Sequence, residues 1–311
     1  MGSGRCDPGR SFVKGRDEEA SERAFAEEWS SAVGPLWCGE VLPRLFEDGL
    51  GERIEGATGL VAECRTGDVV EACRQAWSGA ARLMAVEPTR SLVDVARERA
   101  RAGGGSPVFF KVEPVRSLTF AEDVFRGAVC LGNTHEGAGV FNALSSLARV
   151  VEPGGFICFG GLASDSFPLL MDLLTEHGWT SRVPEIRGAI DAYRLLPSVE
   201  QAIEESEERL DLDLEAAGGA DLEVRLGPSG SVLEHPVFRE FFDPRLLHLY
   251  DEDVDRSAAR QYLRTAVEEY FGSEEVRDTL GLVWARFTVR EPETYTVDDD
   301  DVIEEVIEAD E

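Results

Sequence analysis

The feature that most constrains this chain is a regular alternation of short apolar runs with helical stretches between residues 59 and 163. Runs of this length are typical of buried strands, and the stretches between them show helical periodicity. Strands are predicted at 59–62, 82–86, 108–112, 127–131 and 156–159, and helices at 68–77, 91–101 and 139–149. Because helices of this length connect parallel neighbours, we predict a Rossmann-like α/β fold, with one doubly wound, mostly parallel sheet covered on both faces.

Further elements are predicted on both sides of this core. They are a helical stretch over 21–46 interrupted at Gly34-Pro35, a helix from Asp165 or Ser166 to His177, a charged helix over 198–210, a short strand over 222–226, helices over 236–250 and 256–271, and a final antiparallel strand over 279–289. The chain is thus expected to comprise a flexible N-terminal segment (1–20), one domain (21–290) and an acidic segment (291–311). A helical cap over the domain is predicted at about 195–275.

The chain is strongly acidic, with 61 acidic and 31 basic residues and a net charge of −30. Such a charge opposes nonspecific binding to nucleic acid or to an anionic membrane. The six cysteines show no CxxC spacing and do not cluster with the four histidines, so no metal site is predicted. Cys64, Cys130 and Cys158 fall in apolar strand segments and are expected to be buried thiols. No apolar run approaches the roughly 20 residues of a membrane span, and a cytoplasmic protein is expected.

The segment LVAECRTG (60–67) lies where the loop after the first strand of a Rossmann-like unit approaches its cofactor. Glycines in such a loop let the backbone come close, and the N-terminus of the following helix favours polar or anionic groups. Glu87 ends the second strand, 20 residues after Gly67, where an acid hydrogen-bonds ribose hydroxyls. Loop and acid together predict a site for a nucleoside-containing cofactor.

The order of these segments resembles the class I S-adenosylmethionine-dependent methyltransferase superfamily, particularly the ubiquinone/menaquinone-pathway branch. The matching pieces are LVAECRTG, MAVEPTRSLVDVARERA, SLTFAEDVFRGAVCLGNTH and LARVVEPGGFICFGGL. The last is the most specific, since family members carry an Arg-Val-Leu-Lys-Pro-Gly-Gly turn that resembles residues 149–155. The resemblance covers about residues 23–163 and implies S-adenosyl-L-methionine as cofactor. It implies cofactor contacts from Glu63, Gly67, Glu87, Glu113 and Asn133.

The chain departs from the family pattern in the cofactor loop. The family loop reads acid-x-Gly-x-Gly-x-Gly, whereas Val61 stands here at the acid, Glu63 at the first glycine and Arg65 at the second; only Gly67 is kept. The family also has an aspartate near the adenine, where this chain has Pro114 with Glu113 beside it as a substitute. The fourth strand, which opens Phe-Asp in the family, opens Phe125-Arg126 here.

Two functions remain open from the sequence. Glu63 and Arg65 could pair with each other or with Asp68 as a structural plug, which predicts a degenerate, pseudo-methyltransferase protein with a binding, scaffold or regulatory role. Alternatively, the loop could hold the cofactor in a modified way, which predicts an active methyltransferase acting on a small molecule or a protein. The weak catalytic candidate for the latter is His135, which follows the fourth strand beside Asn133 at the ligand-binding edge of the sheet.

The acidic segment 291–311 holds 11 acids and no base. Within it, Val302, Ile303, Val306 and Ile307 stand at helical spacing. Such a segment either keeps the protein soluble or folds as a short helix on a protein partner.

Overall fold

A computed structural model of the chain describes residues 16–47, 50, 52–104, 106–131, 137–176, 199–242 and 256–291. The seven strands are β1 (Thr58–Ala62), β2 (Arg82–Glu87), β3 (Val108–Val112), β4 (Phe125–Leu131), β5 (Val151–Leu162), β6 (Leu212–Pro228) and β7 (Glu275–Val289). The helices are α1 (Arg16–Ala32), α2 (Gly34–Leu36), α3 (Leu42–Leu45), α4 (Asp68–Ala76), α5 (Arg90–Gly103), α6 (Gly137–Val150), α7 (Pro168–Glu176), α10 (Val199–Arg209) and α12 (Arg256–Phe271). Short π or 3-10 turns are η1 (Trp37–Val41), η2 (Glu52–Ile54), η3 (Val115–Ser117), η4 (Ser229–Glu234) and η5 (Phe238–Phe242).

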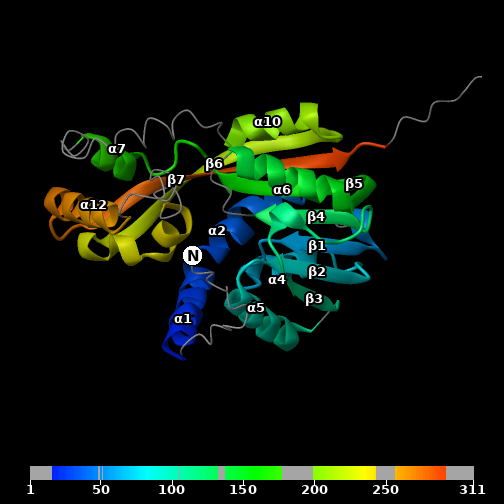
Figure 1. The fold of residues 1–311 in the computed structure, drawn as a ribbon, viewed down its shortest axis with the longest axis horizontal. Coiled ribbons are helices and arrows are strands. Elements are labelled where there is room, and N and C mark those ends of the chain that lie inside the picture. The colour runs from blue at the N-terminus through cyan, green and yellow to red at the C-terminus, as the bar shows by residue number, and fades with distance from the viewer. Residues whose placement is uncertain are drawn as a thin grey trace, which may run out of the picture.

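These seven strands form one sheet in the order β3-β2-β1-β4-β5-β7-β6 (Figure 1). The five strands from β3 to β5 are parallel, and β7 runs antiparallel to both β5 and β6. The predicted Rossmann-like, doubly wound sheet with a terminal antiparallel strand is therefore confirmed. Between residues 58 and 131 the predicted strands agree with the observed ones to within two residues at each end.

Both faces of the sheet are buried, because successive side chains of a strand alternate between two apolar cores. On β1, Val61 packs into the core that α1 to α4 cover, while Leu60 and Ala62 pack into the core on the other face, under α6 and α10. The same alternation buries Cys158 on one face and Cys130 on the other. Cys64 is buried as well, so the three thiols predicted to be buried are so.

The C-terminal half departs from the sequence prediction. Strand β6 has 17 residues, whereas only 222–226 was predicted as strand, so the region expected to be a helical cap also contains sheet. Its side chains alternate between buried and exposed, and Ala216 to Ala220 carry almost no strand signal; pairing along all of β7 holds it extended. Helix α1 likewise begins at Arg16 rather than at Ser21.

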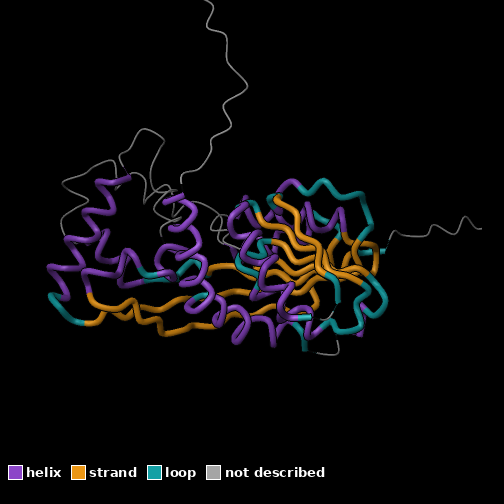
Figure 2. The backbone as a smooth tube through the Cα atoms, turned by 90° about the horizontal axis from the view of Figure 1, so that it is seen from below, coloured by secondary structure: helices purple, strands orange, loops and turns teal. Residues whose placement is uncertain are grey.

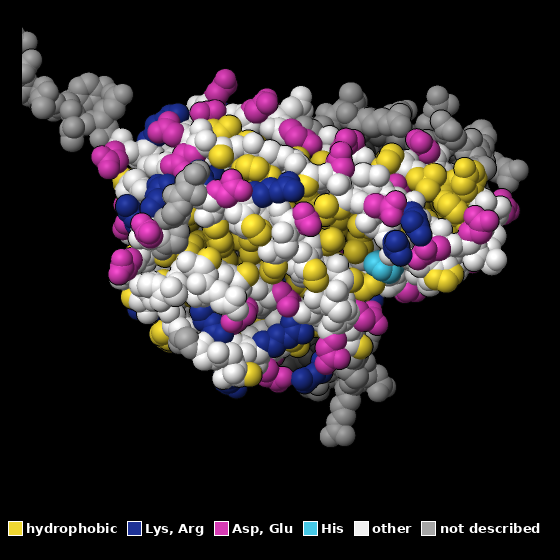
Figure 3. Space-filling model, turned by 180° about the vertical axis from the view of Figure 1, so that it is seen from behind, with side chains coloured by type: hydrophobic (Ala, Val, Ile, Leu, Met, Phe, Trp, Pro, Cys, Tyr) yellow, Lys and Arg dark blue, Asp and Glu magenta, His cyan; other side chains and the backbone are white. Residues whose placement is uncertain are grey.

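Strands β6 and β7 run on beyond the parallel strands and carry a second layer of helices (Figure 2). We call this part the β6–β7 extension: residues 220–242 and 256–281. Its apolar side chains, including Phe238, Phe241 and Leu263, are continuous with the core on the α1–α4 face of the sheet. On the opposite side of the molecule from that in Figure 1, apolar side chains gather in a band across the middle of the surface (Figure 3). No helix in the described ranges is long and apolar enough to cross a membrane.

Candidate functional site

The loop between β1 and α4 keeps the backbone of a glycine loop although two of its glycine positions are occupied by large residues. Glu63 has φ 53°, Arg65 has φ 46° and Gly67 has φ 89°, all in the left-handed region. Residues with a Cβ pay roughly 1–2 kcal/mol in this region, so Glu63 and Arg65 are held there by their contacts. The loop is tied to its surroundings by backbone hydrogen bonds from Cys64 N to Val86 O, at 3.1 Å, and from Gly67 N to Cys64 O, at 2.8 Å.

Those contacts centre on the guanidinium of Arg65. Its Nη1 lies 3.3 Å from each carboxylate oxygen of Glu87 and 3.2 Å from Oε2 of Glu63. Its Nε donates to Oε1 of Glu240 on η5, at 3.0 Å. The Arg65 side chain is 12% exposed and that of Glu87 is 0% exposed. One buried cation thus joins the loop, the end of β2 and the β6–β7 extension; we call these four residues the Arg65 cluster.

Glu87 has all its hydrogen-bonding capacity directed toward its own chain. Besides the Arg65 guanidinium, Oε2 accepts a hydrogen bond from the Arg65 backbone N at 3.1 Å, and Oε1 accepts one from Thr89 N at 3.1 Å. The acid that was expected to hold a ribose therefore stands at the predicted place, at the carboxyl end of β2, but its carboxylate is already occupied by Arg65.

Burial shapes the electrostatics of the cluster. Burial raises the pKa of Glu63; Arg65 lowers it, the negative charges of Glu87 and Glu240 raise it, and the net pKa is above the ordinary value. Burial lowers the pKa of Arg65, but the charges of Glu240, Glu87 and Glu63 outweigh this effect and leave the pKa above its usual range. Arg65 is therefore charged at every physiological pH, and three acids share it.

Glu113 and Asp68 have hydrogen-bond and ion-pair partners that the sequence did not predict. Glu113 lies beside Glu87, since its N donates to Glu87 O at 3.1 Å, but its carboxylate accepts from Thr119 N at 2.8 Å and lies 3.0 Å from Nζ of Lys111. Burial raises the pKa of Glu113, but the contacts with Thr119 and Lys111 bring it below its ordinary value. Asp68 does not join the plug predicted with Glu63 and Arg65; it pairs with Arg99 instead, at 3.0 Å.

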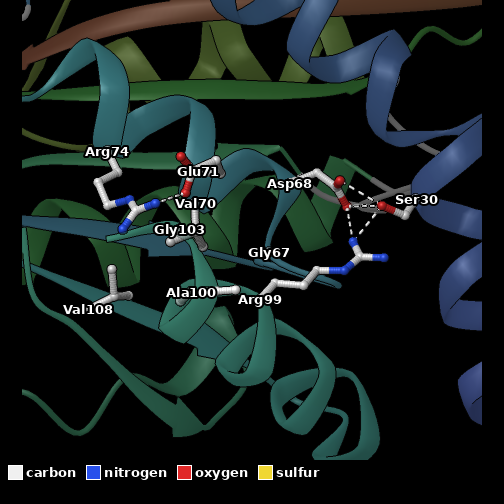
Figure 4. A pocket seen from close by; sticks show the side chains of 11 residues that line it. Ser30, Gly67, Asp68, Val70, Glu71, Arg74, Arg99, Ala100, Gly103 and Val108 are labelled. Atoms are coloured by element: carbon white, nitrogen blue, oxygen red, sulfur yellow. Dashed lines mark hydrogen bonds and ion pairs between the residues drawn. The ribbon is translucent and has the colours of Figure 1, made fainter. Parts of the chain in front are cut away.

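A second charged group surrounds Asp68 at the start of α4. Arg99 of α5 also contacts Ser30 of α1, and Ser30 Oγ donates to Asp68 Oδ1 at 2.6 Å (Figure 4). Arg99 also donates to Thr66 O at 3.3 Å. A cavity of about 430 Å³ runs from here between α4 and α5, past Glu71, Arg74 and Gly103. No member of the Arg65 cluster lines this cavity, but Gly67, one of the predicted cofactor contacts, does.

Other sequence candidates lie elsewhere or outside the described residues. Asn133 and His135 fall in the undescribed range 132–136, so their predicted roles stay predictions. Arg126 opens β4 at the amino end of the parallel strands, away from the loop, and its Nη1 pairs with Glu152 at 3.1 Å. Sequence reasoning missed Glu240, since nothing in a predicted helix over 236–250 marks it as a partner of Arg65.

Residues 60–155 match the family model described as "Methyltransferase domain". Over these residues the chain is therefore similar to a methyltransferase domain. This confirms the family resemblance predicted from the motifs. A comparison with curated proteins found no match.

Solved structures of low sequence identity overlap this methyltransferase-fold chain. The YcgJ protein from Bacillus subtilis is 18% identical over 78% of this chain and 98% of its own, with a TM-score of 0.45. A geranyl diphosphate C-methyltransferase from Streptomyces coelicolor, solved with Mg²⁺, geranyl diphosphate and S-adenosyl-L-homocysteine, is 15% identical over 91% and 86%, with a TM-score of 0.42. The [4+2]-cyclase SpnF is 19% identical over 80% and 82%, with a TM-score of 0.44.

The residues at the predicted cofactor site do not fit S-adenosylmethionine in the arrangement observed. A ribose at Glu87 needs free carboxylate oxygens, and both lie within 3.3 Å of Arg65 Nη1. The loop positions where family members have glycine carry side chains that extend into the cluster rather than leaving the backbone accessible. The roles of Glu63, Gly67, Glu87 and Glu113 as cofactor contacts stay predictions.

Proposed function

We propose that this chain is a pseudo-methyltransferase, a methyltransferase-fold protein that acts as a binding, scaffold or regulatory protein with its cofactor site closed by Arg65. The observation that carries the proposal is the pairing of Arg65 with both oxygens of Glu87, a fully buried carboxylate. The side chain that replaces a family glycine neutralises the acid that would otherwise bind the ribose.

The energetics favour closure. Separating a buried ion pair costs about 3–5 kcal/mol, because each charge loses its partner in a medium that solvates it poorly. A cofactor that would bind an open site at micromolar concentration gains about 8 kcal/mol. If the cofactor had to displace Arg65, its net binding free energy would be about 3–5 kcal/mol, which corresponds to a Kd near millimolar.

An active methyltransferase is the second candidate, and the loop backbone favours it. Glu63, Arg65 and Gly67 all keep the left-handed conformation that lets a glycine loop approach a cofactor. If the Arg65 side chain swung out of the cluster, the path of the loop would not need to be rebuilt. S-adenosyl-L-methionine would then supply a methyl group for a small molecule or a protein.

Isothermal titration calorimetry with S-adenosylmethionine and S-adenosylhomocysteine tests the proposal. We expect the natural chain to bind either ligand with a Kd no tighter than about millimolar. The double variant Glu63→Gly, Arg65→Gly frees Glu87 and suits the left-handed backbone, and it should bind S-adenosylhomocysteine at least about tenfold more tightly, a gain of about 1.4 kcal/mol.

Two controls make this experiment decisive. Adding Glu87→Ala to the double variant should abolish the gained binding, whereas adding Arg99→Met, which changes the neighbouring charged group, should leave it intact. Micromolar binding by the natural chain that is lost in Glu87→Ala would instead refute the closed site and favour the active methyltransferase. Circular dichroism confirms that each variant is folded.

We also propose that the acidic segment 291–311 makes protein contacts through Val302, Ile303, Val306 and Ile307, in a protein of the cytoplasm. Its 11 acids and absence of bases suit a surface that is basic and apolar, not nucleic acid or an anionic membrane.

A further inference from the structure

Strand β3 forms one edge of the sheet and leaves apolar side chains in solvent on both of its faces. It pairs with β2 on one side, and no strand of the described residues pairs with it on the other. Phe109 is 52% exposed and Val112, which points to the opposite face, is 39% exposed. An edge strand of this kind presents unpaired backbone groups beside apolar surface and readily accepts a further strand.

The surroundings of β3 are basic in a chain that is otherwise acidic. Residues 90–120, which cover α5, β3 and η3, hold six basic and three acidic residues, a net charge of +3, against −30 for the whole chain. Arg101 and Arg116 are exposed and make no ion pair with any described residue. Lys111, on β3 itself, alternates with Phe109 along one face of the strand. The partner of this edge should therefore combine acids with apolar residues.

We propose that the acidic segment 291–311 of the same chain binds this edge by adding a strand beside β3. The segment presents four consecutive aspartates, Asp298 to Asp301, followed by Val302-Ile303, Glu304-Glu305 and Val306-Ile307. In an extended conformation each face of such a strand carries a valine or isoleucine, then a glutamate, then a second valine or isoleucine. That order of apolar and acidic side chains complements the apolar and basic side chains of the β3 edge.

The topology brings the segment within reach. Strand β7 runs antiparallel to β5, so it ends at the amino ends of the parallel strands, where β3 begins. Five strand spacings separate β7 from β3, about 24 Å at 4.8 Å each. Between Glu291 and Val302 the chain can span about 36 Å when extended. The segment therefore reaches the edge within one molecule.

This assignment rests on the proposed protein-binding role of the segment and names its surface. The edge strand is covered by the chain's own acidic segment, and any other protein that binds the segment must displace it from β3.

Hydrogen–deuterium exchange of the full chain, with labelling from milliseconds to minutes, tests the contact. The comparison is with a full-length variant in which Val302, Ile303, Val306 and Ile307 are all serine, which alters no described residue. Amides of 108–112 should exchange about tenfold faster in the variant, which corresponds to a loss of about 1.4 kcal/mol of pairing. Amides of β6, the opposite edge, should be unchanged.

A matched pair of surface variants tests the edge itself. Phe109→Asp should release the segment, so that amides of 302–307 exchange faster, whereas Val124→Asp should not, because Val124 is similarly exposed (40%) but lies outside β3. Raising NaCl from 0.05 to 1 M should speed exchange at both 108–112 and 302–307 in the natural chain, since it screens the attraction between the charges.

Equal exchange of 108–112 in the natural chain and the four-serine variant would overturn the proposal. Protection that rises with protein concentration, together with dimers in sedimentation velocity, would also overturn it, because the segment would then bind a second copy. Neither outcome touches the closed cofactor site, which calorimetry tests through Glu63, Arg65 and Glu87.

Discussion

Arg65 belongs to the loop between β1 and α4, and Arg99 of α5 lies beside the same loop. The surroundings of the two arginines differ sharply. Arg65 lies inside the molecule, 12% exposed, and shares its charge among Glu63, Glu87 and Glu240. Arg99 lies at the surface, 38% exposed, and serves one acid, Asp68. The first group joins three separate parts of the chain; the second joins α5 to the start of α4 and to α1.

The difference shows that similar ion pairs have different consequences. A buried carboxylate without a partner is destabilising, so the Arg65 cluster resists being separated once the chain has folded. A half-exposed pair adds little to the free energy of unfolding, because water stabilises each separate charge almost as well as the opposite charge does. The Arg65 cluster therefore holds the loop, the end of β2 and the β6–β7 extension together, while the Arg99 group contributes modestly to local packing.

The largest effect is expected from Arg65→Met, which removes the shared cation and leaves three acids buried together. We expect the free energy of unfolding at pH 7 to fall by about 3–5 kcal/mol, measured by urea denaturation. The charge of Arg65 lowers the pKa of Glu63, so its removal raises that pKa further, and the stabilisation from neutral Glu63 is present at low pH and is lost as the pH rises. The deficit should consequently shrink between pH 7 and pH 5.

Arg65→Lys serves as the control, since it keeps a cation but loses the planar guanidinium that contacts several carboxylates at once. Its free energy of unfolding should lie between those of Arg65→Met and the natural chain. A loss below about 1 kcal/mol for Arg65→Met would mean that the cluster behaves like a surface pair, and the contrast with Arg99 would disappear.

An intermediate effect is expected from Glu63→Gln, and it should depend on pH. Burial raises the pKa of Glu63 above its unfolded value despite the charge of Arg65. Its contribution is therefore fully present below the unfolded pKa and is lost as the pH rises through the folded pKa. Gln does not titrate. The free energy of unfolding of the variant, relative to that of the natural chain, should therefore rise by about 1 kcal/mol between pH 4 and pH 8.

Melting temperatures across this pH range provide the measurement. The exposed residue Glu27, changed to Gln, gives a matched control for the loss of one surface carboxylate. A constant difference for Glu63→Gln would show that Glu63 titrates as it does in the unfolded chain.

The smallest effect is expected from Arg99→Met, which opens the half-exposed pair with Asp68. We expect a loss of about 0.2–1 kcal/mol at low salt, by urea denaturation, and a smaller one in 1 M NaCl, where the charges are screened. A loss of several kcal/mol that is insensitive to salt would place Arg99 in the same class as Arg65.

The core of the fold followed from the sequence because it depends on local periodicity. Leu60, Val61 and Ala62 are all apolar, as required of a strand buried on both faces, and they pack alternately into two cores. Strand β6 lacked such a signal, since its Ala- and Gly-rich middle gains its conformation from β7, and pairing between strands separated by a helix is a tertiary event.

For the site, the sequence by itself determined that glycines are missing from the loop and that an acid ends β2 at Glu87. Only the tertiary structure decided how these facts combine. The partner Glu240 is 175 residues from Arg65 along the chain, and the β6–β7 extension brings it to within 3.0 Å. Residue spacing reports which side chains share an element, whereas the packing of elements decides which charges meet and exclude water.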